Sequence, residues 1–375
     1  MSNVIDNVFE DGGIACRRAR SPAIRCGSVS TVSAETRILP PFPRATIHDV
    51  ARVAGVSVAT VSKVINGRYG VAEATFARVM SVVTELGYES SLVASSLRRT
   101  RTNVIGILVA DFEPFSTELL KAIASANSGS GYELLAYSGP NAAENPVGWE
   151  LRSLSRLAGT LIDGAIIVTP TVLMPSTSIP VVAIDPHIGQ GGPSTVGSDN
   201  VAGARAATDH LISLGHRRIA HIRGRVDLES AQLREAGYRD SLAAAGIEFD
   251  PRLVRDGNYR APESGDAARE LLSRPDRPTA IFAANDLSAL RVLAVAEELG
   301  IRVPAELSVI GFDDVPEAAR ATPPLTTMAQ PLQEMGATAH RILLELLHGD
   351  DVAQHLHLPA ELVVRASTAP PPITG

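Results

Sequence analysis

Residues 46–66 predict two short helices joined by a tight turn, and no other segment constrains the fold as strongly. Thr46 is a residue type that caps helices, and Asp49, three positions later, completes the reciprocal capping pair. Gly55 suits the left-handed backbone that ends a helix and turns the chain. Ser57 then caps the second helix. This order of caps and turn predicts a helix-turn-helix unit.

Both helices carry apolar side chains at the spacing of one helical face, as expected for helices that pack together. The two faces consist of Val50, Val53 and Ala54 in the first helix and of Val61, Val64 and Ile65 in the second. A turn signal, Asn66-Gly67, ends the second helix.

The outward side of the second helix carries small uncharged groups and one lysine, where a surface helix would usually carry Glu and Lys. Small groups allow close approach to DNA, since methyl groups can contact thymine and a lysine can donate to guanine. Hydroxyl groups can bind phosphates. We expect DNA contacts from Thr46, Ser57, Val58, Ala59, Thr60, Ser62, Lys63 and Asn66. The alternative is an ordinary helical hairpin in a protein core.

This segment resembles the DNA-binding headpiece of the LacI/GalR family of bacterial repressors, which typically reads T-I-x-D-V-A-x-x-A-G-V-S-x-x-T-V-S-x-V-I/V-N. The resemblance continues through residues 71–75, 85–88 and 94–97 and then to about the last ten residues. It implies a fold of an all-α helix-turn-helix headpiece followed by an α/β two-lobed regulatory domain with parallel sheets, similar to periplasmic binding proteins. The predicted domains are a headpiece at 45–89, a hinge at 90–101 and an effector-binding and dimerisation domain at 102–375.

The net charge of −7 looks unsuitable for a DNA-binding protein until it is divided along the chain. Residues 45–101 hold seven Lys/Arg and four Asp/Glu, residues 102–375 hold 21 and 33, and residues 1–44 hold six and four. The headpiece is therefore basic, as phosphate binding requires, and the large domain is acidic.

Two cysteines, Cys16 and Cys26, make a disulfide framework unexpected and favour a reducing cytoplasm, where the protein would associate with the nucleoid. No apolar run is long enough for a membrane span. Residues 1–44 show no sustained periodicity and predict a disordered extension or upstream sequence translated from a misassigned start. A basic arm that adds DNA affinity is the functional alternative.

A third helix is predicted from Glu73 to Leu86, with Phe76, Val79, Val83 and Leu86 facing inward. Within the hinge that follows, Leu97 stands where the family has a leucine that wedges into the minor groove and kinks the operator. In that role the free-energy cost of unstacking the bases would be offset by the additional contacts that a bent duplex makes with the protein. Packing of Leu97 against the next domain is the alternative. The hinge departs from the family at Ser90-Ser91 and at Ser95.

The large domain alternates apolar strands with helical stretches, which predicts parallel sheets covered by helices on both faces. The strands are expected at 104–110, 132–137, 164–168, 181–184, 219–223, 280–283 and 307–312, and examples of the helices at 203–214, 230–245, 262–273 and 287–299. This number of units favours two lobes with a cleft. Crossovers are expected near 185–200 and 320–330, after which the C-terminal segment returns to the first lobe.

Ligands of open α/β sheets bind beyond the carboxyl ends of the strands. That rule points to the stretch from Asp111 to Phe115, to Asp185, to Asn285-Asp286 and to Asp313-Asp314. The family resemblance adds Arg234, Tyr259 and Gln330, and it gives Phe115 a ring-stacking role. The predicted effector site consists of Asp111, Phe115, Asp185, Arg234, Tyr259, Asn285, Asp313 and Gln330. Helix capping is the competing role for Asp199, Asp286 and Asp314, and packing is the expected role of Trp149.

The combined interpretation is a repressor that acts as a homodimer, or as a tetramer, on a palindromic double-stranded operator. A small ligand between the lobes, most often a sugar in this family and a corepressor such as a purine in a minority, would set its DNA affinity. A solute-binding protein for carbohydrate transport is the alternative. An enzyme is not expected, because the sequence has no nucleophile elbow, phosphate-binding loop or metal-ligand set, and no cofactor is implied.

Overall fold

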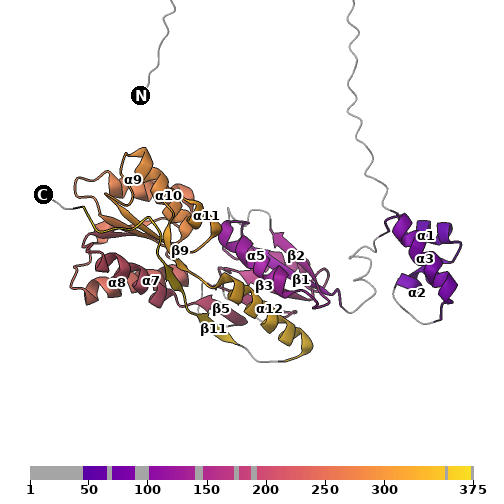
Figure 1. Ribbon diagram of the computed structural model, residues 1–375. Helices are drawn as coiled ribbons and strands as arrows, with labels where there is room; N and C mark the ends of the chain where they lie inside the picture. Colours follow the sequence, from indigo (N-terminus) through magenta and orange to yellow (C-terminus); the bar gives the residue numbers. More distant parts are fainter. Residues whose placement is uncertain are drawn as a thin grey trace, which may run out of the picture. The chain divides into compact units, whose positions relative to one another are not determined.

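The computed structural model describes residues 45–65, 70–88, 101–139, 147–172, 177–186, 192–350 and 354–372. The chain divides into two compact units, residues 1–89 and residues 90–375 (Figure 1). Asn66, Leu97, both cysteines and the predicted N-terminal extension lie outside the described residues.

The first unit is a bundle of three helices, α1 (Ile47–Ala54), α2 (Val58–Ile65) and α3 (Glu73–Glu85). The reciprocal capping pair predicted for α1 is present, because the Asp49 backbone N–H donates to the Thr46 hydroxyl and the Asp49 carboxylate accepts from the Thr46 backbone. Gly55 ends α1 with a φ of 65°. The core of the bundle consists of Val50, Ala51, Ala54, Val61, Val64, Val79 and Val82.

Two residues predicted to face this core do not. Val53 is 47% exposed and Phe76 is 44% exposed. Ala51 takes the place of Val53, since burial of Val50, Ala51 and Ala54 turns the opposite side of α1 outward. Phe76 lies in the first turn of α3, and most of that turn is exposed. A bundle this small buries a narrower stripe than the apolar pattern suggests.

The second unit contains two six-stranded sheets, which confirms the predicted fold class of two lobes with parallel strands. The first sheet has the order β11-β5-β4-β3-β1-β2, from β11 (His355–Leu358), β5 (Ser194–Ser198), β4 (Val181–Ile184), β3 (Gly164–Val168), β1 (Val104–Val109) and β2 (Glu133–Ser138). The second has the order β12-β10-β9-β8-β6-β7, from β12 (Glu361–Val363), β10 (Thr326–Ala329), β9 (Ser308–Asp313), β8 (Ala280–Ala283), β6 (Ile219–Arg223) and β7 (Val254–Asp256). Only the pairing of β10 with β12 is antiparallel among the described strand pairs.

Helices cover both faces of each sheet. In the second lobe, α7 (Asn200–Ser213) and α8 (Glu229–Ala244) pack on one face, and α9 (Ala261–Leu272) and α10 (Asp286–Glu298) pack on the other (Figure 1). In the first lobe, α5 (Pro114–Ala126) and α12 (Leu332–His348) share one core, and α6 (Trp149–Leu157) lies in the other. A short helix, α11 (Pro316–Arg320), follows β9. Among the helices described, none combines the length and the apolar content that crossing a membrane requires.

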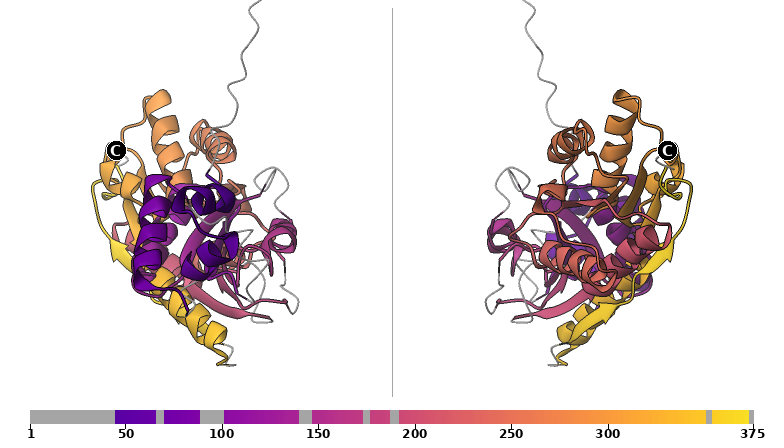
Figure 2. Two further views of the ribbon diagram at one scale, coloured as in Figure 1. Left: turned by 90° about the vertical axis from the view of Figure 1, so that its right-hand side faces the viewer. Right: turned by 90° about the vertical axis from the view of Figure 1, so that its left-hand side faces the viewer.

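The chain passes between the lobes three times. It leaves the first lobe between β5 and α7, returns between β10 and α12, and leaves again between β11 and β12. Figure 2 shows yellow α12 and the orange helices α9 and α10 at opposite ends of this unit. The C-terminal segment was expected to return to the first lobe. This is correct for α12 and β11 and wrong for β12, which pairs with β10 of the second sheet. This strand has three residues, too short to give a recognisable apolar pattern.

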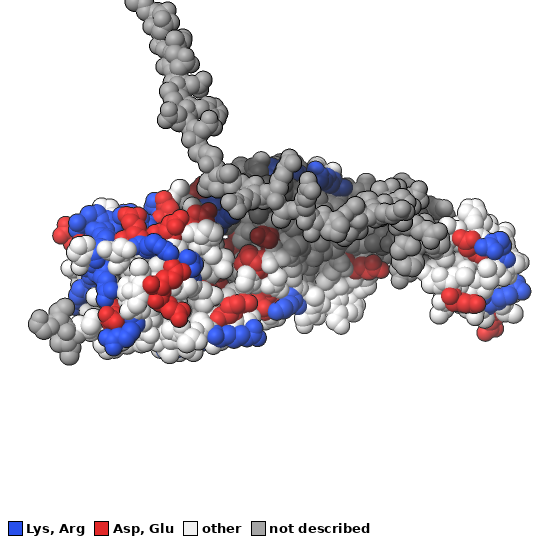
Figure 3. Space-filling view, turned by 90° about the horizontal axis from the view of Figure 1, so that it is seen from above, with Lys and Arg blue, Asp and Glu red and all other residues white. Residues whose placement is uncertain are grey.

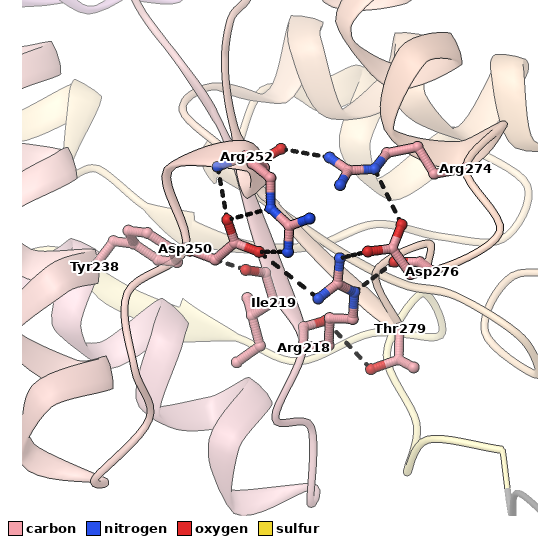
Figure 4. Close-up of polar contacts among 8 residues, drawn as sticks. All are labelled: Arg218, Ile219, Tyr238, Asp250, Arg252, Arg274, Asp276 and Thr279. Carbon is pink, nitrogen blue, oxygen red and sulfur yellow. Dashed lines mark hydrogen bonds and ion pairs between the residues drawn. The ribbon is translucent and has the colours of Figure 1, made fainter.

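A network of charged side chains joins three loops at the amino ends of the second-lobe strands (Figure 4). Arg218, just before β6, donates to the Asp276 carboxylate at 2.7 Å and approaches Asp250 at 3.8 Å. Asp250 also pairs with Arg252, and Asp276 pairs with Arg274. Figure 3 shows charged side chains of both signs interleaved over this lobe. The network lies at the edge of the sheet opposite the carboxyl ends of its strands.

Candidate functional site

The side of α2 predicted to face outward is only partly exposed. Ala59 and Lys63 are exposed, whereas Val58 is half-buried and packs partly against the core of the bundle. The Thr60 backbone N–H donates to the Ser57 hydroxyl at 3.1 Å, which is a cap at the start of α2. Ser62 is half-buried on the same helix. This face is therefore open to a partner at Ala59 and Lys63, with Val58 offering part of its side chain.

The hydroxyl groups of Thr46 and Ser57 both form hydrogen bonds that stabilise the start of a helix. The Thr46 hydroxyl donates to the Asp49 carboxylate at 2.7 Å, and Arg52 donates to the same carboxylate at 2.8 Å. These bonds, that of Arg52 foremost, hold the pKa of Asp49 well below its ordinary value. The Ser57 and Thr60 hydroxyls lie 2.9 Å apart. Both caps present their backbone at a helix N-terminus, which favours contact with a phosphate.

A cavity of about 430 Å³ lies in the second unit, and all eight residues of the predicted effector site line it. Asp111, Phe115 and Asp185 come from the first lobe. Arg234, Tyr259, Asn285 and Asp313 come from the second, and Gln330 lies on the segment that crosses between them. The cavity is in the size range of small-molecule sites. Residues far apart in the sequence thus meet in one place between the lobes.

Backbone strain is concentrated at this cavity. Seven non-glycine residues have positive φ in the part of the chain that the structure describes, and five of them line the cavity. These five are Thr169, Asp185, Asn258, Tyr259 and Asp313. Such conformations cost free energy and cluster at ligand sites.

Arg234 is the central cation of the cavity and is almost completely buried. Its Nε donates to the Asn200 side chain at 2.8 Å, and one Nη donates to the Ala284 carbonyl at 2.5 Å. The guanidinium lies 3.8 Å from the centre of the Phe312 ring and 3.7 Å from the Asp313 carboxylate. The remaining N–H groups of this planar fork are available for a ligand.

The carboxyl groups around Arg234 are less acidic than free ones. Burial raises the pKa of Asp185, although Arg234 opposes the change. Burial also raises the pKa of Asp313 well above its ordinary value, with Arg234 again opposing and Asp286 adding to the rise. Gln330 donates to Asp313 at 2.7 Å. The buried guanidinium of Arg234 therefore lies among two carboxyl groups, Asp185 and Asp313, that resist ionisation, and this arrangement suits a neutral polar ligand.

Tyr259 reaches the cavity because a glycine lies beneath it. A Cβ atom on Gly224 would lie 2.1 Å from the Tyr259 ring, so no other residue fits there without moving the ring. The Tyr259 hydroxyl is 3.1 Å from the Ser230 hydroxyl. Burial raises the pKa of Tyr259, so the phenol is neutral and can donate or accept a hydrogen bond.

Sequence reasoning missed Trp149 and Ser230, which also line the cavity. Neither residue directly follows a strand, so the strand-end rule did not include them. Trp149 was assigned to packing alone, and it does belong to a hydrophobic cluster of the first lobe. Its indole N–H and the Oε1 of Gln330 are buried without a hydrogen-bond partner among the described residues.

Of the three aspartates for which helix capping was the competing role, only Asp199 caps a helix. Asp199 does cap α7, because it accepts from the Ala202 backbone. The cap of α10 is Asn285 and not Asp286, whose carboxylate accepts from Thr327 and from the Val315 backbone. Asp314 caps no helix and pairs with Arg365 at 2.6 Å. Asn285 therefore has a structural bond as well as its place at the cavity.

Comparison with known proteins covers both units. Residues 46–91 match the family described as bacterial regulatory proteins, lacI family, and residues 208–368 match the periplasmic binding protein-like domain. The HTH-type transcriptional regulator DegA of Bacillus subtilis (strain 168) is 37% identical over 338 residues, which are 87% of this chain and 99% of DegA.

Two solved structures agree over the same range. The complex of the transcriptional regulator CelR with cellobiose has a TM-score of 0.63 at 34% identity and covers 86% of this chain and 100% of that one. The lac repressor dimer bound to operator and the anti-inducer ONPF has a TM-score of 0.69 at 29% identity and covers 87% and 99%. None of these three is a transport protein, so the solute-binding alternative gains no support.

Proposed function

The chain belongs to the lacI family of bacterial regulatory proteins, and from that premise we propose that it represses transcription at a palindromic operator under the control of a bound sugar. The observation that carries the proposal is the convergence of eight separately predicted side chains on one cavity between two lobes. The same chain carries a capped helix-turn-helix whose second helix exposes Ala59 and Lys63.

The groups around the cavity favour a neutral polyhydroxylated ligand. Arg234 donates, Asp185 and Asp313 exchange hydrogen bonds with hydroxyl groups, and the rings of Phe115 and Tyr259 cover apolar faces. The relative CelR binds cellobiose, which supports a sugar for this chain as well. The rise in the pKa of both carboxyl groups disfavours a strongly cationic ligand, which would need them ionised.

The ligand acts on DNA through the lobes. A sugar that touches both lobes binds their closed arrangement more tightly than the open one, and this difference in affinity is the coupling free energy. We propose a homodimer, as in the lac repressor bound to operator, so that two headpieces contact the two halves of the site. The proposal includes action at the chromosome in the cytoplasm and no catalytic activity, so incubation with sugars should give no turnover.

DNA recognition is tested through Lys63. An operator is first selected from a random duplex library with the full-length protein. Lys63→Ala should then weaken specific binding about tenfold or more, because a contact to a guanine edge is lost. Lys121→Ala, which removes one exposed cation from the other unit, is the matched control and should leave the affinity unchanged. Equal affinities for all three proteins would reject the assigned role of α2.

Ligand control is tested through Arg234. Arg234→Lys keeps the charge but loses the planar fork, so it should leave operator affinity intact and weaken the response to a sugar at least tenfold. Thermal shift of the wild-type protein against a panel of mono- and disaccharides and hypoxanthine identifies the ligand, and fluorescence anisotropy of labelled operator measures the response. An unchanged response in the variant would remove Arg234 from the site.

A further inference from the structure

Trp149 has a position that packing alone does not explain. It is the first residue of α6, it is 1% exposed, and it belongs to one hydrophobic cluster with Leu108 and Ile167 of the first sheet. The same side chain lines the cavity. Its indole N–H is nevertheless buried without a hydrogen-bond partner among the described residues.

The start of α6 is held in place by its neighbours. The Glu150 carboxylate accepts from the backbone N–H groups of Thr171 at 2.8 Å and Val172 at 2.7 Å. The Gly148 backbone N–H donates to the Thr171 hydroxyl at 2.9 Å. These bonds fasten the helix start to the segment after β3, where Thr169 and Thr171 also line the cavity. The indole is therefore a fixed part of the cavity wall.

A buried donor without a partner destabilises the protein, because it loses the hydrogen bond that it makes with water in the unfolded chain. A phenylalanine would fill the hydrophobic cluster without that penalty. On the crossing segment, the Oε1 of Gln330 is buried and lacks a partner in the same way. Among the described residues, two side chains that line the cavity therefore hold one donor and one acceptor without partners, and hydroxyl groups of a ligand that reaches them can satisfy both.

We propose that Trp149 determines ligand specificity, with its indole N–H donating to an oxygen atom of the bound sugar. The inference rests on the proposed function, since it assigns one wall of the same cavity. A sugar that presents an oxygen at this wall binds more tightly than its deoxy analogue, which leaves the indole unpaired.

The chain contains one tryptophan, so ¹⁵N-labelled indole gives a single N–H resonance that reports on this position. The full-length protein is titrated with D-glucose, D-ribose, D-galactose, cellobiose, maltose and lactose, with affinities measured by calorimetry. For a sugar that binds, the indole resonance should shift, and Trp149→Phe should weaken binding about three- to tenfold. Leu154→Ala perturbs the same hydrophobic cluster away from the cavity and should keep the affinity.

Deoxy analogues of the bound sugar complete the test. One of these analogues should bind the wild-type protein more weakly than the parent sugar does. The Trp149→Phe variant should bind that analogue and the parent sugar with equal affinity. The inference alone is overturned by a sugar whose binding requires Arg234 but which leaves the indole resonance and the affinity of Trp149→Phe unchanged. If none of the sugars binds, the proposed control by a sugar is rejected, and the proposed role of Trp149 is rejected with it.

Discussion

The side chains of the cavity depend on small residues placed beneath them, and Gly224 is the clearest case. Gly224→Ala would place a methyl group where the Tyr259 ring lies, so the ring must move away from this position. We expect at least tenfold weaker sugar binding with normal operator affinity in the absence of sugar. Gly197→Ala, where an added Cβ would meet only an ordinary contact with His357, is the matched control, because neither Gly197 nor Gly224 has a positive φ. Calorimetry that finds equal sugar affinities would show that Tyr259 is not a ligand contact.

His221 gives a pH dependence to stability. It stacks between Tyr238 and Phe282 with no exposure, and burial lowers its pKa to about 4 from an ordinary 6.5. The unfolded chain therefore takes up this proton at higher pH than the folded protein. The stability that neutral His221 contributes is fully present above pH 6.5 and is lost as the pH falls toward 4, by about 3 kcal/mol at most.

His221→Phe isolates this effect, because every other titrating group is common to both proteins. We expect the free energy of unfolding, measured by urea denaturation, to fall less between pH 7 and pH 4 in the variant than in the wild type. Parallel pH profiles would mean that the folded protein protonates His221 as easily as the unfolded chain does.

At the scale of elements, the network around Arg218 fastens the loops before β6, β7 and β8. Arg218→Ala removes bonds to both the backbone carbonyl and the carboxylate of Asp276 and should lower the free energy of unfolding by about 1–2 kcal/mol. Arg302→Ala, which breaks an exposed pair with Glu306, is the matched control and should cost less than about 0.5 kcal/mol. Equal effects in urea denaturation would show that the network adds nothing beyond a surface ion pair.

Apolar runs predicted the elements that bury apolar side chains. All seven expected strands are present with bounds within one residue of the prediction. The strand β5 was missed, although it is completely buried, because its sequence is Ser-Thr-Val-Gly-Ser. Two of its polar side chains find partners at β11 and the residue before it: Ser194 accepts from the Gln354 backbone, and the Thr195 hydroxyl lies 3.0 Å from the His355 ring. Hydropathy cannot identify a strand whose burial depends on hydrogen bonds between distant segments.

The candidate site was largely predictable for a topological reason. In each lobe the parallel strands bring their carboxyl ends to one edge of the sheet, and both of these edges contribute to the cavity. Asp185 follows β4 of the first sheet and Asp313 ends β9 of the second, and both line the cavity. Trp149 could not be found in this way, because it enters the cavity from a helix start on the side of the first sheet. Its unpaired indole N–H is a property of the packed structure and leaves no signal in the sequence.

At the scale of the whole molecule, DNA affinity should fall steeply with salt. Residues 45–101 hold seven Lys/Arg per chain, so a dimer that uses all of them gives a slope of log K against log salt no steeper than roughly −13. Fluorescence anisotropy at several salt concentrations measures the slope. A flat profile contradicts binding through phosphates, and a steeper one means that the six cations of residues 1–44 contribute as a basic arm.

The three passages between the lobes have a consequence for how this protein can be divided. The first sheet needs β11 from near the C-terminus, and the second needs β10 and β12 from either side of that strand. Neither lobe is encoded by one uninterrupted stretch of the gene. A recombination event or an engineered chimera with a single junction therefore cannot exchange one complete lobe without also changing part of the other.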